Sequence, residues 1–191
     1  TITAVLEDAD GNAVYTETLS VSETVHFKTV VPHVKQWSAE VPNLYQLYLH
    51  ITAEDGTTVE AVPMDVGFRT FELKNGIMCI NGKRILFRGV NRHEFNCKRG
   101  RAITREDMLW DIRFLKRHNL NAVRTCHYPD QSLWYKLCDR YGIYLIDETN
   151  LESHGSWQKL GQLEPSWNVP GSFPEWQECV LDRANSMFQR D

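Results

Sequence analysis

Polar side chains that could do chemistry follow three short apolar runs of this sequence. His93 and Glu94 lie in the polar segment that opens after the first run, Arg124 and His127 close the second, and Asp147 follows the third. A single histidine or carboxylate is more often structural than functional. Because three successive runs end in such side chains, the pattern favours a functional site.

Two features of this set indicate more specific chemistry. Arg124 ends an otherwise apolar strand, where its charge needs a carboxylate or phosphate partner to offset the loss of water. Glu152 and His154 are two residues apart in a loop. They could bind one cation through a carboxylate oxygen and an imidazole nitrogen, and they are therefore the candidate metal ligands.

The segment 121–146 is expected to position these residues. Short apolar runs at 122–123 and 143–146 bracket an amphipathic stretch after Pro129, which is the β-α-β pattern of a parallel sheet. Gly142 suits the position just past the end of the helix, where the backbone turns left-handed.

A similar unit precedes this segment. The apolar run 85–90 predicts a strand, and Thr104 with Asp107 three residues later predicts a capped helix that ends near Asn119. Strand, helix, strand, helix, strand is the opening of an α/β fold, either an open sheet or a (β/α)₈ barrel. No Gly-x-Gly-x-x-Gly loop follows a strand, and the polar residues gather at the strands' carboxyl ends, so a barrel is favoured.

The first seventy residues carry strand and turn signals and little chemistry. Asp10-Gly11 and Asp55-Gly56 predict turns, and residues 24–31 and 44–51 are rich in strand formers. In the last of these runs, the face carrying Tyr45, Leu47, Leu49 and Ile51 is expected to face the core. About five short strands suggest an immunoglobulin-like β-sandwich.

The junction between the two regions contains two Asn-Gly pairs, at Asn75-Gly76 and Asn81-Gly82, which predict a hairpin. We place a domain boundary near Arg69, with a sandwich domain at residues 1–69 and a barrel domain at residues 70–191. A whole barrel needs about 250 residues, so this chain is expected to hold only the first three βα units. The loop 155–174 is long, and its tryptophans Trp157 and Trp167 are expected to pack rather than to stack on a sugar.

Composition narrows the class of protein. A net charge of −4 disfavours a nucleic-acid partner, and no apolar run is long enough for a membrane helix. Five cysteines at irregular spacings, without a Cys-x-x-Cys pair, predict reduced thiols in a cytoplasmic protein. Thr1 begins inside a strand pattern and Asp191 ends a helix pattern without a stop signal, so we expect a fragment of a longer chain.

Several motifs together resemble family 2 of the glycoside hydrolases, in the form found in bacterial β-galactosidases. The resemblance covers nearly the whole chain, and its motifs are specific. They are Trp37-Ser-Ala-Glu-Val-Pro-Asn-Leu-Tyr45, Val66-Gly-Phe-Arg69, Gly89-Val-Asn-Arg-His-Glu94, Asn121-Ala-Val-Arg-Thr-Cys-His-Tyr-Pro129, Gly142-Ile-Tyr-Leu-Ile146 and Asp147-Glu-Thr-Asn-Leu-Glu-Ser-His-Gly155.

This resemblance implies an enzyme that hydrolyses terminal β-galactosides with retention, within a longer oligomeric or multi-subunit protein. The acid/base and nucleophile glutamates of such an enzyme, which lie about 5–5.5 Å apart, are expected beyond Asp191, so the fragment itself should be inactive. By resemblance, His93 and His127 bind the sugar and Arg124 orients the nucleophile. Glu152 and His154 resemble ligands of an active-site Mg²⁺.

One departure and three alternatives accompany this prediction. After Glu94 the chain reads Phe95-Asn96-Cys97, where the best-known bacterial enzymes have histidines, so local substrate contacts differ. A β-glucuronidase of the same family usually lacks the Glu-x-His-Gly present here. A non-catalytic sugar-binding or assembly module is the second alternative. A metal-dependent hydrolase is the third, and the His-x-His that commonly opens such sites is missing after Val90.

Overall fold

The computed structural model describes residues 1–152 and 173–191, and the predicted positions Trp157 and Trp167 lie outside them. The chain divides into two compact units. The first comprises Thr1–Leu86 with Asp139–Gly142, and the second comprises Phe87–Cys138 with Ile143–Asp191. Within the described ranges, no helix is long and apolar enough to cross a membrane.

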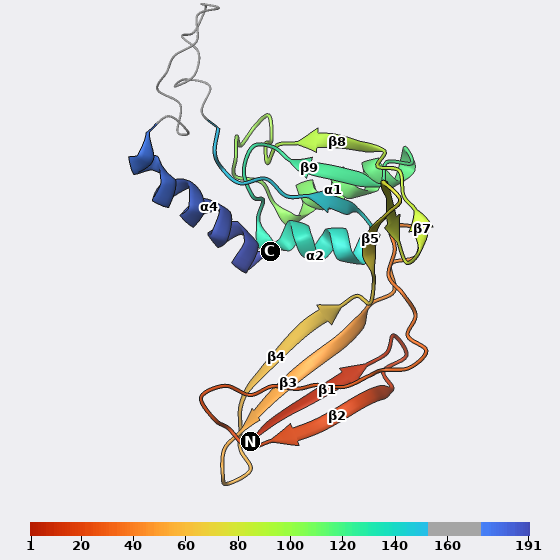
Figure 1. Ribbon diagram of the computed structural model, residues 1–191, viewed down its shortest axis with the longest axis vertical. Helices are drawn as coiled ribbons and strands as arrows, with labels where there is room; N and C mark the ends of the chain where they lie inside the picture. The colour runs from red at the N-terminus through yellow and green to blue at the C-terminus, as the bar shows by residue number, and fades with distance from the viewer. Residues whose placement is uncertain (153–172) are drawn as a thin grey trace, which may run out of the picture. The chain divides into compact units, whose positions relative to one another are not determined.

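The first unit contains an antiparallel sheet of four strands (Figure 1). The predicted turns join its hairpins, because Gly11 and Gly56 adopt the positive φ values of 81° and 85° that a side chain would strain. The sheet order is β2-β1-β3-β4. The strands are β1 (Ile2–Glu7), β2 (Ala13–Leu19), β3 (Tyr45–Thr52) and β4 (Thr58–Val66).

The strand predicted at residues 24–31 is wrong. This segment is irregular, and Val30 is 88% exposed. Strand propensity is realised only where a neighbouring strand supplies hydrogen bonds and a packing surface, and no strand of the described residues pairs with this segment. The face predicted for β3 is only partly correct, because Tyr45 is buried while Leu47, Leu49 and Ile51 are half-buried.

The predicted hairpin at the junction is confirmed. Asn75-Gly76 and Asn81-Gly82 are both left-handed, with φ near 51° at each asparagine and near 75° at each glycine. These turns connect β5 (Phe71–Lys74), β6 (Ile77–Ile80) and β7 (Lys83–Arg84). By its contacts the hairpin belongs to the first unit. The domain boundary near Arg69 stays a prediction.

The second unit holds three parallel strands connected by helices, in the order β10-β9-β8. Adjacent strands follow one another in sequence, as in the opening of a barrel. The elements are β8 (Gly89–Arg92), α1 (Arg105–Arg117), β9 (Ala122–Thr125), α2 (Ser132–Tyr141) and β10 (Tyr144–Ile146).

The first of these strands begins later than predicted. Ile85 bonds instead to Met78 of the preceding hairpin, and pairing with β9 starts at Gly89 opposite Ala122. A Cβ atom at Gly89 would lie 2.9 Å from the carbonyl oxygen of Ala122, so the strands approach closely only because a glycine stands there.

The core of the second unit lies between the helices and β9. Met108 and Ile112 of α1 pack with Val123 of β9 and Trp134 of α2, all essentially inaccessible to water. The predicted capping box at Thr104 forms in full and starts α1. This apolar packing holds β9 rigidly beneath the residues that follow it.

The last described elements are η2 (Pro174–Trp176) and α4 (Gln177–Arg190), which follow residue 172. The helix pattern noted before Asp191 is therefore present as α4. None of its residues is fully buried. Val180, Ala184 and Met187 are half-buried, while Phe188 is 79% exposed.

Candidate active site

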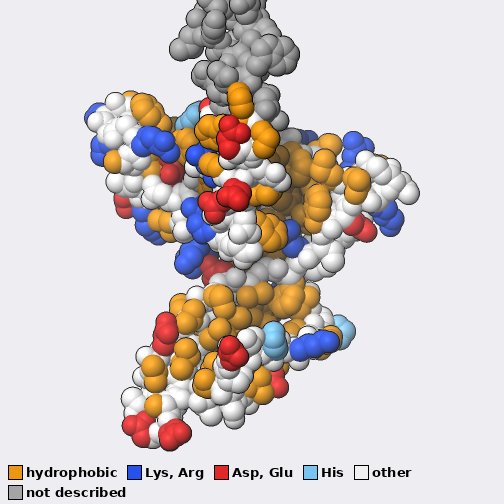
Figure 2. All heavy atoms as spheres, turned by 60° about the vertical axis from the view of Figure 1, so that its left-hand side comes forward, with side chains coloured by type: hydrophobic (Ala, Val, Ile, Leu, Met, Phe, Trp, Pro, Cys, Tyr) orange, Lys and Arg blue, Asp and Glu red, His pale blue; other side chains and the backbone are white. Residues whose placement is uncertain are grey.

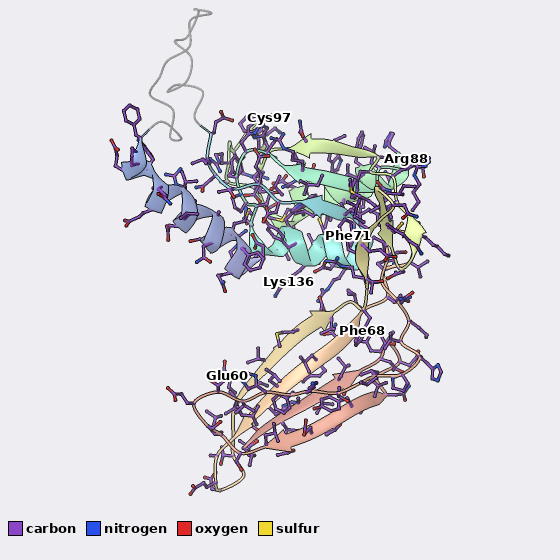
Figure 3. The ribbon with its side chains drawn as sticks, in the orientation of Figure 1. Glu60, Phe68, Phe71, Arg88, Cys97 and Lys136 are labelled. Atoms are coloured by element: carbon purple, nitrogen blue, oxygen red, sulfur yellow. The ribbon has the colours of Figure 1, made fainter. Side chains whose placement is uncertain are left out.

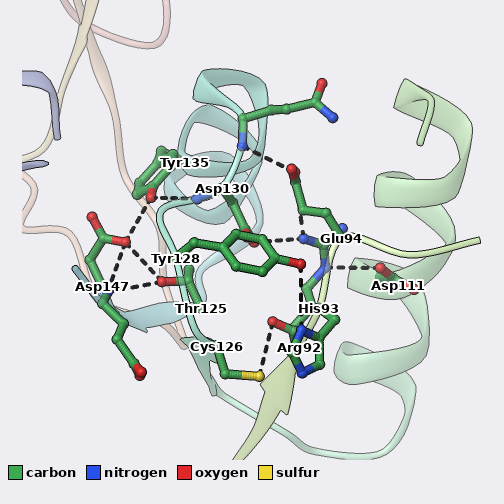
Figure 4. A network of polar contacts seen from close by, with 12 residues as sticks. Arg92, His93, Glu94, Asp111, Thr125, Cys126, Tyr128, Asp130, Tyr135 and Asp147 are labelled. Atoms are coloured by element: carbon green, nitrogen blue, oxygen red, sulfur yellow. Dashed lines mark hydrogen bonds and ion pairs between the residues drawn. The ribbon is translucent and has the colours of Figure 1, made fainter. Parts of the chain in front are cut away.

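The parallel register brings the predicted residues to one edge of the sheet. Arg92 pairs with Thr125 and Ile146 pairs with Arg124, so the residues just past each strand become neighbours. As a result the rings of His93 and His127 lie 5.3 Å apart at an angle of 72°. The Oη atom of Tyr128 lies 3.4 Å from Nδ1 of His93 on the same side (Figure 4).

Arg124 has the carboxylate partner that its position requires. Its Nε forms an ion pair with Oε2 of Glu148, which follows β10. The other carboxylate oxygen of Glu148 lies 3.1 Å from Nδ1 of His127, and Nη2 of Arg124 lies 3.3 Å from the same nitrogen. The Nη1 group donates to Oδ1 of Asn91 at 3.2 Å. Glu148 therefore holds the guanidinium and the imidazole together.

Of the two candidate metal ligands, the structure describes only Glu152. Oε2 of Glu152 lies 3.8 Å from Nδ1 of His127, and the Glu152 side chain is 44% exposed. His154 lies outside the described residues. The structure thus brings His93, His127, Arg124 and Glu152 to one place, while the role of each remains a prediction.

A buried ion network beneath this edge was not predicted. Arg92 is 7% exposed, and its Nη1 lies 2.6 Å from Oδ2 of Asp130, while its Nε donates to Asp111 at 2.9 Å. Glu94 lies 3.9 Å away and accepts a bond from the backbone N–H of Gln131. The guanidinium also lies over the ring of Trp134, 3.7 Å from its centre (Figure 4).

The charged groups of this network have opposite effects on the pKa of Asp130. Burial raises the pKa of Asp130 to about 6, and the charges of Glu94 and Asp147 act in the same direction. Arg92 acts in the opposite direction, so it is the group that favours the ionised form of this carboxyl.

A second group of bonds fixes the start of the segment after β10. Thr125, which is fully buried, donates to Oδ1 of Asp147 at 2.8 Å, and the hydroxyl of Tyr135 donates to the same oxygen at 2.7 Å. The backbone N–H of Glu148 donates in turn to Thr125 Oγ1. Burial raises the pKa of Asp147, although the bonds from Tyr135 and Thr125 lower it. These bonds set the position from which Glu148 reaches Arg124.

The sequence does contain a signal for the buried ion pairs of Arg92. Arg92 ends an apolar strand just as Arg124 does, and the same argument about an unpaired charge applies to both. Its partners Asp111 and Asp130 are 19 and 38 residues away, so no local spacing connects them. Only the folded arrangement of β8, α1 and α2 brings them together.

The whole arrangement has one polar edge with exposed or half-buried histidines, supported from below by buried ion pairs. A family model described as "Glycosyl hydrolases family 2, TIM barrel domain" matches residues 71–191, and the model "Glycosyl hydrolases family 2" matches residues 1–69. The chain belongs to glycosyl hydrolases family 2. Its two regions are the sandwich domain of that family and the start of its barrel, in which β8, β9 and β10 are the strands present.

Proteins named β-galactosidase match this family 2 chain closely. It is 61% identical to a β-galactosidase of Clostridium acetobutylicum over 100% of its length, which is 21% of that protein. It is 65% identical to a β-galactosidase of Streptococcus thermophilus over 83% of the chain and 15% of that protein. A protein of Lactobacillus acidophilus named β-galactosidase large subunit is 47% identical over 96% of the chain and 30% of that protein. The chain spans about a fifth of the first of these relatives.

Solved structures of the family share the fold at lower identity. A Bifidobacterium dentium β-glucuronidase complexed with coumarin-3-O-glucuronide superposes with a TM-score of 0.73 at 28% identity, over 77% of this chain and 24% of the other. A Ruminococcus gnavus β-glucuronidase in complex with D-glucuronic acid has a TM-score of 0.77 at 24% identity, over 100% of this chain and 29% of the other. The second likeness concerns the fold alone.

Proposed function

We propose that the protein containing this chain is a retaining β-galactosidase that hydrolyses terminal, non-reducing β-D-galactose residues of lactose-type substrates. The single observation that carries this proposal is the 61% identity with a β-galactosidase over the whole chain. The adjacent rings of His93 and His127 support it, because two neighbouring imidazole groups can hydrogen-bond the hydroxyls of a sugar.

In this proposal the chain binds and orients, and it does not itself cleave the bond. His93 and His127 contact the galactose ring from the ends of β8 and β9. Arg124 directs its guanidinium toward the reacting carboxylate and favours its ionised form. The acid/base and nucleophile glutamates, about 5–5.5 Å apart in a retaining enzyme, are proposed to follow Asp191.

We further propose that Glu152, with His154, binds an active-site Mg²⁺. The carboxylate of Glu152 fits such an ion, because it supplies oxygen and is exposed enough for the ion to keep several waters. When bound, the ion would add positive charge beside the reacting groups. Two protein ligands alone bind Mg²⁺ weakly, so a further ligand is proposed to come from outside the described residues.

The remaining features of the proposal concern assembly and compartment. Relatives named large subunit support a multi-subunit or homo-oligomeric protein. All five cysteines lie in the described ranges and are free thiols, which supports a cytoplasmic location.

Substrate specificity of the longer protein tests the function. We expect turnover of a nitrophenyl β-galactoside and little turnover of the matching β-glucuronide. His127→Ala should lower kcat/KM for the galactoside by about 10²-fold, because a group aimed at the sugar is lost. His118→Ala changes an exposed histidine at the C-cap of α1, outside the cluster, and is the matched control that should leave kcat/KM unchanged.

Three outcomes separate the alternatives. Preferred cleavage of the glucuronide would assign the protein to the other activity of the family. Saturable galactose binding without turnover in the longer protein would favour a sugar-binding module. The 191-residue chain alone should show no turnover, and measurable activity in it would contradict the proposed location of the two glutamates.

Removal of the Glu152 carboxylate tests the metal. In the longer protein, Glu152→Gln should lower turnover and weaken activation by added Mg²⁺, because an amide oxygen is a poorer ligand than a carboxylate. Activity should be measured against Mg²⁺ concentration after treatment with a chelator. Glu106→Gln, in the first turn of α1, is the control. Unchanged activation by Mg²⁺ in Glu152→Gln would reject the assignment.

A further inference from the structure

Three potential metal ligands converge at the ends of β8 and β9. His93, Cys126 and His127 each offer one ligand atom, and these atoms all lie within 4.8 Å of one another. The set contains two imidazoles and a thiol and no carboxylate. We propose that these three residues form a binding site for a divalent transition-metal ion of the zinc type, with ligands other than those of the proposed Mg²⁺ site.

The donor set selects the kind of ion. Zn²⁺ binds nitrogen at about 2.0–2.1 Å and thiolate sulfur at about 2.3 Å, usually in a tetrahedron. Ligand atoms around such an ion are roughly 3.5 Å apart, so the cluster reaches this geometry by a small inward shift of its side chains. Mg²⁺ prefers oxygen and would not compete for this site. With three protein ligands, the fourth position is left for water.

Surrounding groups support the ligands as they do at known metal sites. A metal-binding histidine commonly donates a hydrogen bond from its other ring N–H group to a carboxylate. Nδ1 of His127 lies 3.1 Å from Oε1 of Glu148, and an ionised carboxylate can only accept a hydrogen bond. In the proposed metal-bound state, Nδ1 of His127 carries the proton and donates to Glu148, the nearer of its two neighbours, with Nη2 of Arg124 at 3.3 Å. The Nε2 lone pair is then left for the ion. Nδ1 of His93 similarly lies 3.4 Å from the hydroxyl of Tyr128.

The exposure of the three ligands and the charges around them also suit a cation. His93 is exposed and His127 is half-buried, so an ion can arrive from solvent, while the buried Cys126 forms the floor of the site. In the free chain the Cys126 thiol donates to the carbonyl oxygen of Arg92, with sulfur and oxygen 3.4 Å apart. When the ion binds, the S–H proton leaves to solvent and a sulfur–metal bond replaces it. The positive charge of Arg124 is offset by its ion pair with Glu148.

The test uses Co²⁺ as a spectroscopic probe and Zn²⁺ as its competitor, on the full 191-residue chain. Co²⁺ bound to a thiolate gives a sulfur-to-metal absorption band that histidine and carboxylate ligands do not give. We expect about one equivalent of Co²⁺ to produce this band, and Zn²⁺ to abolish it. Cys126→Ser should lose the band, and His93→Ala, at an exposed position, should weaken binding at least about tenfold.

A matched control excludes adventitious thiols. Cys97 is exposed and lies in the loop after β8, outside the cluster (Figure 3). Cys97→Ser should retain the band and the affinity of the unaltered chain. The proposal is overturned if no band forms, if Cys126→Ser retains it, or if His93→Ala binds Co²⁺ as tightly as the unaltered chain. His93→Ala keeps the test valid should Cys126→Ser fail to fold.

One consequence rests on the proposed function. If His93 and His127 bind galactose, Zn²⁺ must compete with the sugar, and it should inhibit the longer protein competitively. Binding of Zn²⁺ without competitive inhibition would leave the metal site in place and reject the assignment of these histidines to the sugar. Absence of the cobalt band in a protein that cleaves galactosides would reject the metal site alone.

Discussion

At the scale of single residues, Arg92 shows how the polar edge is supported. Its guanidinium pairs with Asp130 and Asp111 and covers Trp134, all beneath the histidines. A buried ion pair contributes little relative to an apolar pair of the same size, but removal of one partner leaves an uncompensated charge. The network therefore makes each member necessary for the others.

Arg92→Met should destabilise the chain by about 3–5 kcal/mol near pH 8. The loss should shrink toward pH 4. The pKa of Asp130 already lies at about 6 in the folded chain, above its ordinary value of 3.8, and loss of Arg92 raises it further. A carboxyl whose pKa is raised by folding disfavours the folded state increasingly as pH rises above the unfolded value. Urea denaturation at several pH values, followed by tryptophan fluorescence, measures this dependence.

The double variant Arg92→Met, Asp130→Asn is the control for this prediction. It has no carboxyl at position 130, so the pH dependence that Arg92→Met adds should disappear. An equal loss of stability for Arg92→Met at pH 5 and pH 8 would contradict the assigned role of Asp130.

At the scale of elements, helix and strand ends decide where the site residues lie. Thr104 and Asp107 start α1 by a reciprocal pair of bonds, as predicted. Gly142 ends α2 at φ 72°, and the backbone N–H of Ile143 then bonds to the carbonyl of Cys138. This left-handed ending is the predicted one, and it directs the chain into β10.

Gly142→Ala should destabilise the chain by more than about 2 kcal/mol. Two effects add: a positive φ costs roughly 1–2 kcal/mol for a residue with Cβ, and the new Cβ would lie 2.3 Å from the carbonyl oxygen of Ala39. Gly76→Ala is the matched control, because Gly76 has φ 75° but no atom within 4 Å of a built Cβ. Urea denaturation of both variants should show the larger loss for Gly142→Ala, and equal losses would refute the steric part.

Local chemistry made these elements predictable, and its absence explains the failures. Asn-Gly turns, a capping box and a terminal glycine act within a few residues, so the sequence displays them directly. The prediction of a strand at 24–31 was wrong because strand formation depends on pairing with a distant segment, which local sequence does not show. The apolar run at 85–90 does not form one strand, because the backbone N–H of Ile85 bonds to the carbonyl of Met78 in the preceding hairpin.

At the scale of the whole molecule, the three parallel strands are the start of an unfinished barrel. A closed barrel of this type has eight strands, so β8 and β10 are edges within the described chain. Val90 of β8 and Ile146 of β10 are exposed, as is Phe188 of α4, and Figure 2 shows apolar side chains at the surface. Since a barrel places its chemistry across all its strand ends, three units supply one section of a site.

The sequence by itself determined the family, the order of strands and helices in the second unit and the list of reactive residues at the strand ends. Those features depend on residue type and short spacing. Only the tertiary structure decided that Glu148 is the partner of Arg124 and that Arg92 is buried beside Asp111 and Asp130. It also brings one polar atom each of His93, His127 and Cys126 within 4.8 Å of one another. These contacts depend on strand register and helix packing, which join residues far apart in the chain and leave no local pattern.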